Sequence, residues 1–304
     1  MGVGVAQAKL LLFGEHAVVH GYPALGLGLP YTLRVEALER APDWELDGVP
    51  VRHRAAVFQV IRLLGGIRSP DLPPSHLRLS GDVPIESGLG SSAALCAALA
   101  RLFYPTAGAL EHWALARQAE HVFHGASSGV DVALALHPGL LLFTPGDPYP
   151  ELRSLDGPPL TLVIGSLERA ARARDLILGL REKARAGAVG VLDRLRCLGE
   201  ASREALAYLR PTGADVAALG RLAQRARAIL DELGLGHPAW PLLESAARRA
   251  GSLGGKWSGA GAGGAFWFVF PDEGAARHAA ATLGTLDLPW LLAPRAVTPG
   301  HRTR

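Results

Sequence analysis

Glycine is abundant in this sequence and unevenly spread, which limits the local structures that the chain can form. The 304 residues include 37 glycines, a content well above the roughly 7% that is average for proteins. Many of them lie in four short stretches, at residues 9–21, 84–94, 120–131 and 256–265. Glycine adopts backbone conformations that other residues avoid, so such stretches form tight turns or loops that bring the main chain close to a ligand.

The overall composition restricts the class of protein. Hydrophobic residues make up 49% of the chain and charged residues 19%, which suits a buried core and excludes global disorder. The net charge of +3 is too small to indicate nucleic-acid binding. No stretch approaches the ~20 apolar residues of a membrane span, and the N-terminus lacks a signal-peptide pattern. With Cys96 and Cys197 as its two cysteines, we expect a cytoplasmic protein with reduced thiols packed inside helices.

Strands and helices are predicted in an irregular order, which favours the α+β class over a doubly wound sheet. A proline-rich loop at residues 145–159 separates two predicted domains, 1–158 and 159–304. The predicted strands are one that begins at Lys9, and 31–35, 75–81, 139–144, 160–165, 266–270 and 290–293. The predicted helices are one around 57–64 that ends at Gly65-Gly66, and 91–103, 109–123, 130–136, 174–209, 213–234, 238–250 and 273–283.

Residues 84–94 form a loop of small residues that leads directly into an apolar helix. A helix start offers unpaired N–H groups and the positive end of the helix dipole, which together suit a phosphate group. Ser91 and Ser92 can add hydroxyl contacts to a phosphate or to Mg²⁺. The stretch is not a Walker A motif, because it lacks the Gly-Lys-Ser/Thr ending. From these residues alone, an ordinary helix start after a glycine turn remains the alternative.

The two stretches at 9–21 and 256–265 are less specific. In the first, an apolar strand delivers Glu15 and His16 at a glycine turn, although such a pair is more often a surface hydrogen bond. In the second, four glycines precede a strand, and they allow either close packing against a neighbour or a flexible hairpin.

The stretch at 120–131 carries acid–base candidates. Glu120, His121 and His124 have the order Glu-His-x-x-His, which is not the zinc-protease pattern and argues against a zinc site. Glu120 and Asp131 are more informative, because two carboxylates joined by a Gly-Ser loop can divide their work. One can hold Mg²⁺ while the other faces a substrate hydroxyl. Two capping or solvated acids are the alternative.

Together these stretches resemble, in the expected order, the motifs of the GHMP superfamily of small-molecule kinases. Residues 84–94 resemble its phosphate loop, 120–131 its central acid-bearing segment and 258–264 its C-terminal glycine motif. The run Phe-Gly-Glu-His-Ala-Val-Val-His-Gly at residues 13–21 is very similar to the N-terminal motif of the mevalonate kinase family. The resemblance implies a ribosomal protein S5 domain 2-like N-terminal domain, a ferredoxin-like C-terminal domain and an active site between them.

The resemblance also implies roles for individual residues. Asp131 matches the catalytic base and Lys9 the lysine that pairs with it, and a nearby cation should keep that carboxylate ionised. Mg²⁺ would be held by Ser92 and Glu120. The implied substrate-binding residues are Glu15, His16, His20 and Ser128. The implied ATP-binding residues are Gly88, Leu89, Gly90, Ser91, Ser92, Ala93, Gly259 and Gly261.

The function implied is ATP- and Mg²⁺-dependent phosphorylation of the 5-hydroxyl of (R)-mevalonate to 5-phosphomevalonate, a step of isoprenoid biosynthesis. Mevalonate and ATP are the expected partners, and the chain is expected to be a monomer or homodimer. The alternatives are another kinase of the superfamily, acting on phosphomevalonate, homoserine or a sugar, a relative of diphosphomevalonate decarboxylase, and a non-catalytic ligand-binding relative.

Three departures from the family pattern are visible. Gln7-Ala8 replaces the Pro-Gly that usually precedes the first lysine, and the segment that ends at Asp131 lacks its usual proline. A family Arg-x-Thr segment is expected at Arg172-Ala173-Arg174, where alanine replaces threonine. None of the three removes a group expected to hold metal or move a proton.

Overall fold

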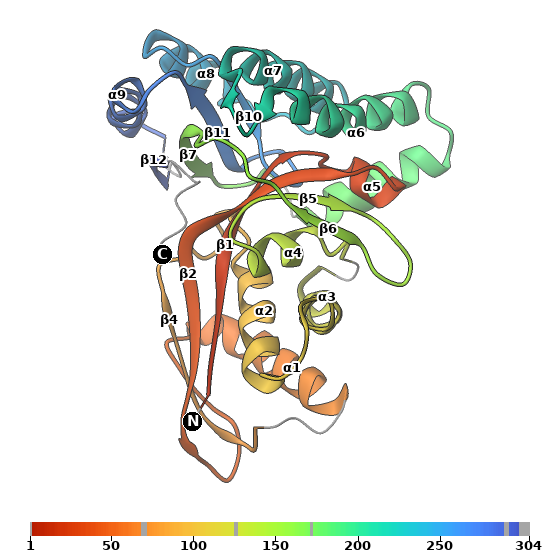
Figure 1. Ribbon diagram of the computed structural model, residues 1–304, viewed down its shortest axis with the longest axis vertical. Helices are drawn as coiled ribbons and strands as arrows, with labels where there is room; N and C mark the ends of the chain where they lie inside the picture. Colours follow the sequence, from red (N-terminus) through yellow and green to blue (C-terminus); the bar gives the residue numbers. More distant parts are fainter. Residues whose placement is uncertain (1, 68–71, 125–126, 171–172, 289–291, 298–304) are drawn as a thin grey trace.

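The computed structural model describes residues 2–67, 72–124, 127–170, 173–288 and 292–297. Two parts are stacked on one another, each consisting of a sheet and its helices (Figure 1). The N-terminal part lies below, and the C-terminal part, drawn from green to blue, lies above. Helices and largely antiparallel sheets that alternate irregularly along the chain confirm the α+β class.

The lower part is built on a sheet of six strands. Its members are β1 (Val3–Phe13), β2 (Ala24–Arg40), β3 (Glu45–Asp47), β4 (Ser75–Gly81), β5 (Gly139–Thr144) and β6 (Glu151–Ser154). The sheet runs in the order β3-β4-β2-β5-β6, and β1 pairs with β2. The pairing of β1 with β2 shifts register between Gln7 and Lys9. Such an irregularity changes the direction of nearby side chains, which matters for Lys9.

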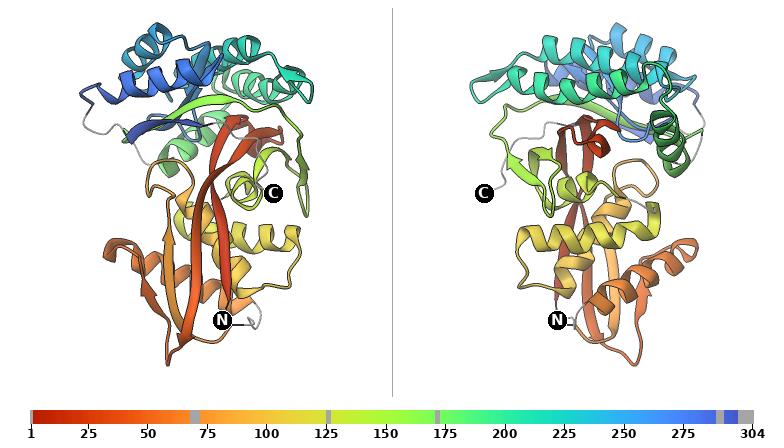
Figure 2. Two further views of the ribbon diagram at one scale, coloured as in Figure 1. Left: turned by 60° about the vertical axis from the view of Figure 1, so that its left-hand side comes forward. Right: turned by 90° about the vertical axis from the view of Figure 1, so that its right-hand side faces the viewer.

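Four helices belong to this part, two of them against the sheet and two packed outside these (Figure 2). They are α1 (Val51–Ile67), α2 (Ser91–Phe103), α3 (Ala109–His124) and α4 (Val130–Leu136). The helices α2 and α4 lie directly against β1 and β2, and α1 and α3 pack on α2. Most of α2 is buried, and its many small alanine side chains allow the close approach of β1. The apolar sequence at residues 91–103, which predicts a buried helix, therefore sets the end of the glycine loop that precedes it.

The upper part is built on a sheet of four antiparallel strands, β10-β11-β7-β12. They are β7 (Thr161–Leu167), β10 (Gly254–Trp257), β11 (Gly264–Phe270) and β12 (Leu292–Val297). Its helices are α5 (Ala173–Arg185), α6 (Val191–Tyr208), α7 (Val216–Glu232), α8 (Trp240–Arg249) and α9 (Glu273–Gly284). Two short elements complete the chain, a 3-10 helix η1 (Ala17–His20) and the hairpin β8 (Leu209–Arg210) and β9 (Gly213–Ala214).

The two parts share a hydrophobic core at their junction. Leu10, Leu12 and Phe13 of β1 belong to the same buried cluster as the residues of β11. Phe13 meets Trp267 edge to face, with 5.9 Å between the ring centroids. A division into domains 1–158 and 159–304 stays a prediction. It agrees with the change of sheet between β6 and β7, but the core continues across it.

Several elements differ from the sequence prediction. The helix predicted at 174–209 is two helices, α5 and α6, because Gly187 and Gly190 between them adopt positive φ angles of 68° and 74°. The strand that carries Lys9 begins earlier, at Val3. The predicted proline-rich loop contains β6, and β10 is an additional strand. Helix α1 continues through Gly65-Gly66 to Ile67.

Three further predictions concern the ends of the C-terminal part and the thiols. The last strand is described from Leu292, and residues 290–291 of its predicted range lie outside the described residues. Both cysteines are free; Cys96 is buried, but Cys197 is exposed on α6, so its predicted packing role is wrong. In the part of the chain that the structure describes, no helix is long and apolar enough to span a lipid bilayer.

Candidate active site

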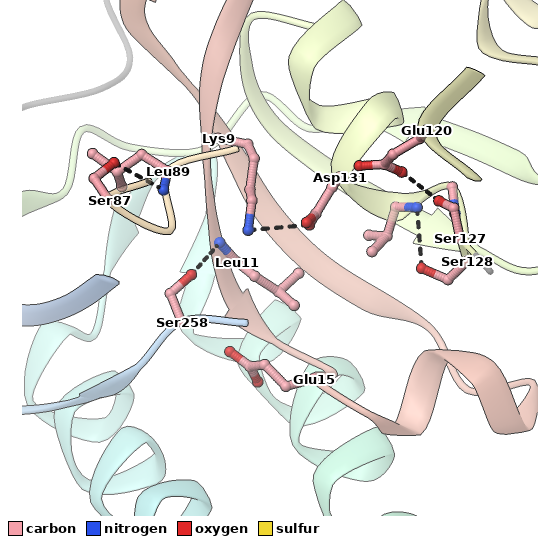
Figure 3. Close-up of polar contacts among 12 residues, drawn as sticks. Lys9, Leu11, Glu15, Ser87, Leu89, Glu120, Ser127, Ser128, Asp131 and Ser258 are labelled. Atoms are coloured by element: carbon pink, nitrogen blue, oxygen red, sulfur yellow. Dashed lines mark hydrogen bonds and ion pairs between the residues drawn. The ribbon is translucent and has the colours of Figure 1, made fainter. Parts of the chain in front are cut away.

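A cavity of about 630 Å³ lies where the two parts of the molecule meet. It receives residues from all four glycine-bearing stretches, and Figure 3 shows how several of their polar groups face one another. The predicted site residues that line it are Lys9, Glu15, His16, Gly88, Gly90, Ser91, Ser92, Glu120, Ser128, Asp131 and Gly259. Segments far apart in the sequence therefore form one site.

Lys9 and Asp131 form an ion pair in this cavity (Figure 3). The distance from Lys9 Nζ to Asp131 Oδ1 is 3.2 Å, and the Lys9 side chain is only 3% exposed, compared with 34% for Asp131. Asp131 lies in the first turn of α4, which follows Gly129 in a left-handed conformation. The positive end of a helix dipole favours a negative charge there. The result is an accessible carboxylate held by a buried cation.

Glu120 is a second carboxylate with different surroundings. It projects from α3, is buried, and accepts a hydrogen bond from the Ser127 hydroxyl. Burial, and after it the charge of Asp131, raises the pKa of Glu120 to about 7, against the opposing effects of the Ser127 hydrogen bond and the charge of Lys9. The two acids therefore differ: Asp131 is open to the cavity and paired, whereas Glu120 is enclosed and lacks a compensating ion pair in the described part of the chain.

The loop before α2 is shaped for close approach of the main chain. Gly88 and Gly90 have positive φ angles of 81° and 79°. A Cβ at Gly90 would lie 2.6 Å from Lys9 Cγ, so only glycine fits beside this lysine. The Lys9 N–H donates to the Leu89 carbonyl at 2.8 Å, which fixes the loop to β1. Helix α2 has Gly90 as its N-cap and no side-chain cap, so its first N–H groups can meet an anion.

The C-terminal glycine loop, residues 258–264, is fastened to the N-terminal part. The Leu11 N–H donates to the Ser258 hydroxyl at 2.9 Å (Figure 3). His16 Nε2 donates to the Ala260 carbonyl at 3.1 Å. Burial lowers the pKa of His16 to about 4, so this ring is neutral at neutral pH. These contacts bring Gly259 to the cavity wall.

Some predicted site residues lie outside the cavity wall. His20 is exposed at the end of η1, and it is not among the described residues that line the cavity. Leu89, Ala93 and Gly261 do not line it either. Leu89 still positions Lys9 through its carbonyl, and Gly261 packs closely on Leu235, where a Cβ would lie 2.7 Å from the carbonyl oxygen.

Two cationic residues, Arg169 and Lys256, lie at the site although the sequence motifs assign no role to either. Arg169 lines the cavity, and its guanidinium lies beside both glycine loops, since a Cβ at Gly88 would be 3.0 Å from Arg169 Nη2. Lys256 is fully buried and pairs with Glu15. Arg172 lies outside the described residues, as do Gly125 and Ala126 of the acid-bearing segment.

The signal for both was present in the sequence. Arg169 lies two residues after the end of the strand β7, and Lys256 is one of the three lysines of the chain.

The donor set of the cavity fits Mg²⁺. Glu120, Asp131 and Ser92 offer oxygen atoms, which this ion prefers, and Mg²⁺ usually binds through one or two carboxylates together with water and substrate phosphates. The described residues hold no cluster of three or more His, Cys, Asp or Glu side chains able to bind a metal alone. Burial raises the pKa of the Glu120 carboxyl group, and a bound cation would favour its ionised form.

Comparison with known proteins agrees with this geometry. The family model described as GHMP kinases N terminal domain matches residues 54–139. The mevalonate kinase of Methanothermobacter thermautotrophicus is 29% identical over 273 residues, which cover 85% of this chain and 87% of that protein. The sequence similarity therefore extends well beyond the matched domain.

Solved structures share the fold over nearly the whole chain. The structure of the L. major mevalonate kinase in complex with R-mevalonate has a TM-score of 0.83 and 21% identity, and covers 99% of this chain and 97% of its own. The phosphomevalonate kinase of Streptococcus pneumoniae has a TM-score of 0.76 and 18% identity, with 98% and 100% covered. The chain therefore contains a match to the GHMP kinases N terminal domain at residues 54–139, and it is similar to mevalonate kinases in sequence and in fold over most of its length.

Proposed function

We propose that this protein transfers the γ-phosphoryl group of ATP to the 5-hydroxyl of (R)-mevalonate, giving 5-phosphomevalonate and ADP. The observation that carries the proposal is the Lys9–Asp131 ion pair, which shares one cavity with the glycine loop and the uncapped start of α2. Phosphoryl transfer requires mainly alignment of the reactants and neutralisation of their charge. This arrangement offers both.

Asp131 is the group that would accept the proton of the acceptor hydroxyl. Its carboxylate is the more accessible partner of the ion pair, so a bound alcohol can reach it. Lys9 is held in place by its burial and by the loop that packs on its aliphatic stem. A cation at that position stabilises negative charge that develops on the transferred group.

The nucleotide would lie along the loop and the start of α2. The N–H groups of Ser91 and Ser92 would meet its phosphates, because these first residues of the helix line the cavity. The same cavity also has apolar wall residues that can enclose a base; they include Leu33, Val49, Val57, Leu79, Val83 and Phe123.

Mg²⁺ would be held by Glu120 and the Ser92 hydroxyl, with Asp131 close by. When bound, this ion supplies neutralisation of the phosphate charge. Glu120 itself must be ionised to bind it, and the raised pKa of Glu120 means that metal binding and proton loss are coupled.

Arg169 is placed to meet an anionic group of a bound substrate. Burial lowers the pKa of Arg169, while the charge of Asp131 acts in the opposite direction. Its Nε is buried and has no hydrogen-bond partner among the described residues. A carboxylate such as that of mevalonate, or a phosphate oxygen, would satisfy it.

The setting of the enzyme is part of the same proposal. The free thiols, Cys96 and Cys197, support a reducing, cytoplasmic location. Mevalonate and ATP are its ligands, and the chain acts as a monomer or homodimer.

A coupled assay of ADP release tests the proposal with four acceptors: mevalonate, phosphomevalonate, homoserine and galactose. We expect the highest kcat/KM with mevalonate and a requirement for Mg²⁺. A preference for another acceptor would assign the protein to a different activity of the superfamily. ATP binding without turnover of any acceptor would indicate a non-catalytic relative.

A further inference from the structure

The buried ion pair between Lys256 and Glu15 joins the two parts of the molecule at the cavity. Lys256 is 0% exposed and Glu15 is 1% exposed. Lys256 lies in β10 of the upper sheet, and Glu15 lies in the turn after β1 of the lower sheet, 241 residues away in sequence. The pair is therefore created only by the tertiary fold.

Glu15 uses only one of its two carboxylate oxygens in this pair. Lys256 Nζ contacts Oε1, whereas Oε2 is buried and has no hydrogen-bond partner among the described residues. Glu15 itself lines the cavity. A buried acceptor without a partner is costly, so a hydroxyl of a bound substrate that donates to Oε2 would relieve this cost.

Lys256 makes further contacts besides its ion pair with Glu15. Its Nζ also donates to the Trp257 carbonyl at 2.7 Å and lies 5.8 Å from the centre of the Phe13 ring. Burial raises the pKa of Glu15 and lowers that of Lys256, and the charge of each residue opposes the effect on the other. Each residue therefore depends on the other to remain charged.

We propose that Lys256 is a positioning residue, which holds Glu15 so that Oε2 accepts a hydrogen bond from a hydroxyl of the phosphoryl acceptor. This inference rests on the proposed function, because it requires a hydroxylated acceptor in the cavity. It predicts that Lys256, which is not a wall residue of the cavity, controls the affinity for the acceptor and not that for the nucleotide.

Steady-state kinetics of Lys256→Met, Glu15→Gln and the double variant test the inference. We expect each single variant to raise the KM for mevalonate by about 10- to 100-fold, the effect of losing a hydrogen bond to a charged group. The KM for ATP should change less than about threefold. If Lys256 acts through Glu15, the effects are non-additive, and the double variant is no worse than the poorer single variant.

Two further variants separate positioning from folding. Lys183→Met removes the exposed lysine of α5 and should leave both KM values unchanged. If Lys256→Met does not fold because it leaves a buried charge unpaired, the neutral pair of Glu15→Gln with Lys256→Met carries the test. Its KM for mevalonate must then rise while its affinity for ADP stays that of the unmodified protein.

The results that overturn the inference are distinct from failure of the proposed function. An unchanged KM for mevalonate in the folded variants would overturn it, as would equal increases in both KM values or additive effects of the two substitutions. Absence of mevalonate phosphorylation by the unmodified protein would instead refute the proposed function.

Discussion

At the scale of single residues, the two acids of the cavity are set apart by their surroundings. Asp131 stands at a helix start beside Lys9, with a third of its side chain exposed. Glu120 is enclosed and bonded to Ser127. The open acid is suited to meet a substrate hydroxyl, and the enclosed acid to hold a cation. Each role can be tested by an isosteric amide.

Asp131→Asn should lower kcat by about 10²–10⁴-fold, the usual contribution of a positioned base. The affinity for ATP should stay within about threefold, because the loop and the start of α2 are unchanged. Asp156→Asn, at an exposed position in the loop before β7, is the matched control and should keep full activity. Near-normal turnover by Asp131→Asn would remove the base assignment.

Glu120→Gln should make the metal-free protein more stable at alkaline pH. It should also weaken Mg²⁺ binding, so that the Mg²⁺ requirement of the activity changes. The pKa of Glu120 is raised from 4.5 to about 7 in the folded protein, so its ionisation costs stability as the pH rises through that window. Removing the charge should increase the free energy of unfolding by up to about 3 kcal/mol at pH 8 and by little at pH 5.

Urea unfolding in EDTA at pH 5 and pH 8 measures this difference, with exposed Glu182→Gln as the control. Equal effects of Glu120→Gln on stability at both pH values would show that the pKa of Glu120 is not raised in the folded protein. An unchanged Mg²⁺ requirement would exclude it as a metal ligand.

At the scale of elements, the site depends on how loops meet strands and helix starts. The apolar helix α2 places the start of a helix at Ser91, and the glycines before it let the loop fold over Lys9. The loop at 127–129 turns the chain from α3 into α4, so that Glu120 and Asp131 approach one another. Small residues are needed at these points for steric reasons.

Gly90→Ala should abolish most of the activity and destabilise the protein. Its Cβ would lie 2.6 Å from Lys9 Cγ, and its φ angle of 79° is unfavourable for alanine. Displacement of Lys9 would break the ion pair with Asp131. We expect at least about a tenfold loss of kcat/KM, equivalent to roughly 1.4 kcal/mol, and a lower melting temperature.

Gly65→Ala in α1 is the matched control, because a Cβ there has no neighbour within 4 Å. This substitution should leave kinetics unchanged and stabilise the helix by up to about 1 kcal/mol. If Gly90→Ala behaves like Gly65→Ala in both measurements, the close contact of the loop with Lys9 is not required.

At the scale of the whole molecule, the cavity lies where the six-stranded and the four-stranded sheet share one hydrophobic core. Buried contacts cross this junction at Phe13–Trp267, Leu11–Ser258 and Glu15–Lys256. They link the turn that carries the N-terminal motif to the strand and loop that carry the C-terminal one. Stability of the junction and geometry of the site are therefore linked.

Ser258→Ala should destabilise the folded protein by about 1–3 kcal/mol, because it leaves the buried Leu11 N–H without its partner. Ser245→Ala removes a hydroxyl on the exposed face of α8 and should change stability by less than about 0.5 kcal/mol. Chemical denaturation of both variants provides the measurement. Equal effects would mean that the Leu11–Ser258 hydrogen bond contributes nothing to the junction.

The sequence by itself determined the local elements and most of the candidate site. Glycine clusters located the loops, and the apolar runs at 91–103 and 130–136 gave the bounds of α2 and α4 directly, because burial and helical period are local properties of a sequence. The motif resemblance located Lys9, Glu120 and Asp131. It also included His20, which is not among the described residues that line the cavity.

Only the tertiary structure decided which charged groups share the cavity and which pair with one another. Arg169 and Lys256 can be noticed in the sequence, but their contacts come from segments that are remote in the chain. The raised pKa of Glu120 and the pairing of Glu15 likewise arise from burial and distance between charges. Both quantities depend on the three-dimensional arrangement, because electrostatic interaction and desolvation act through space and not along the sequence.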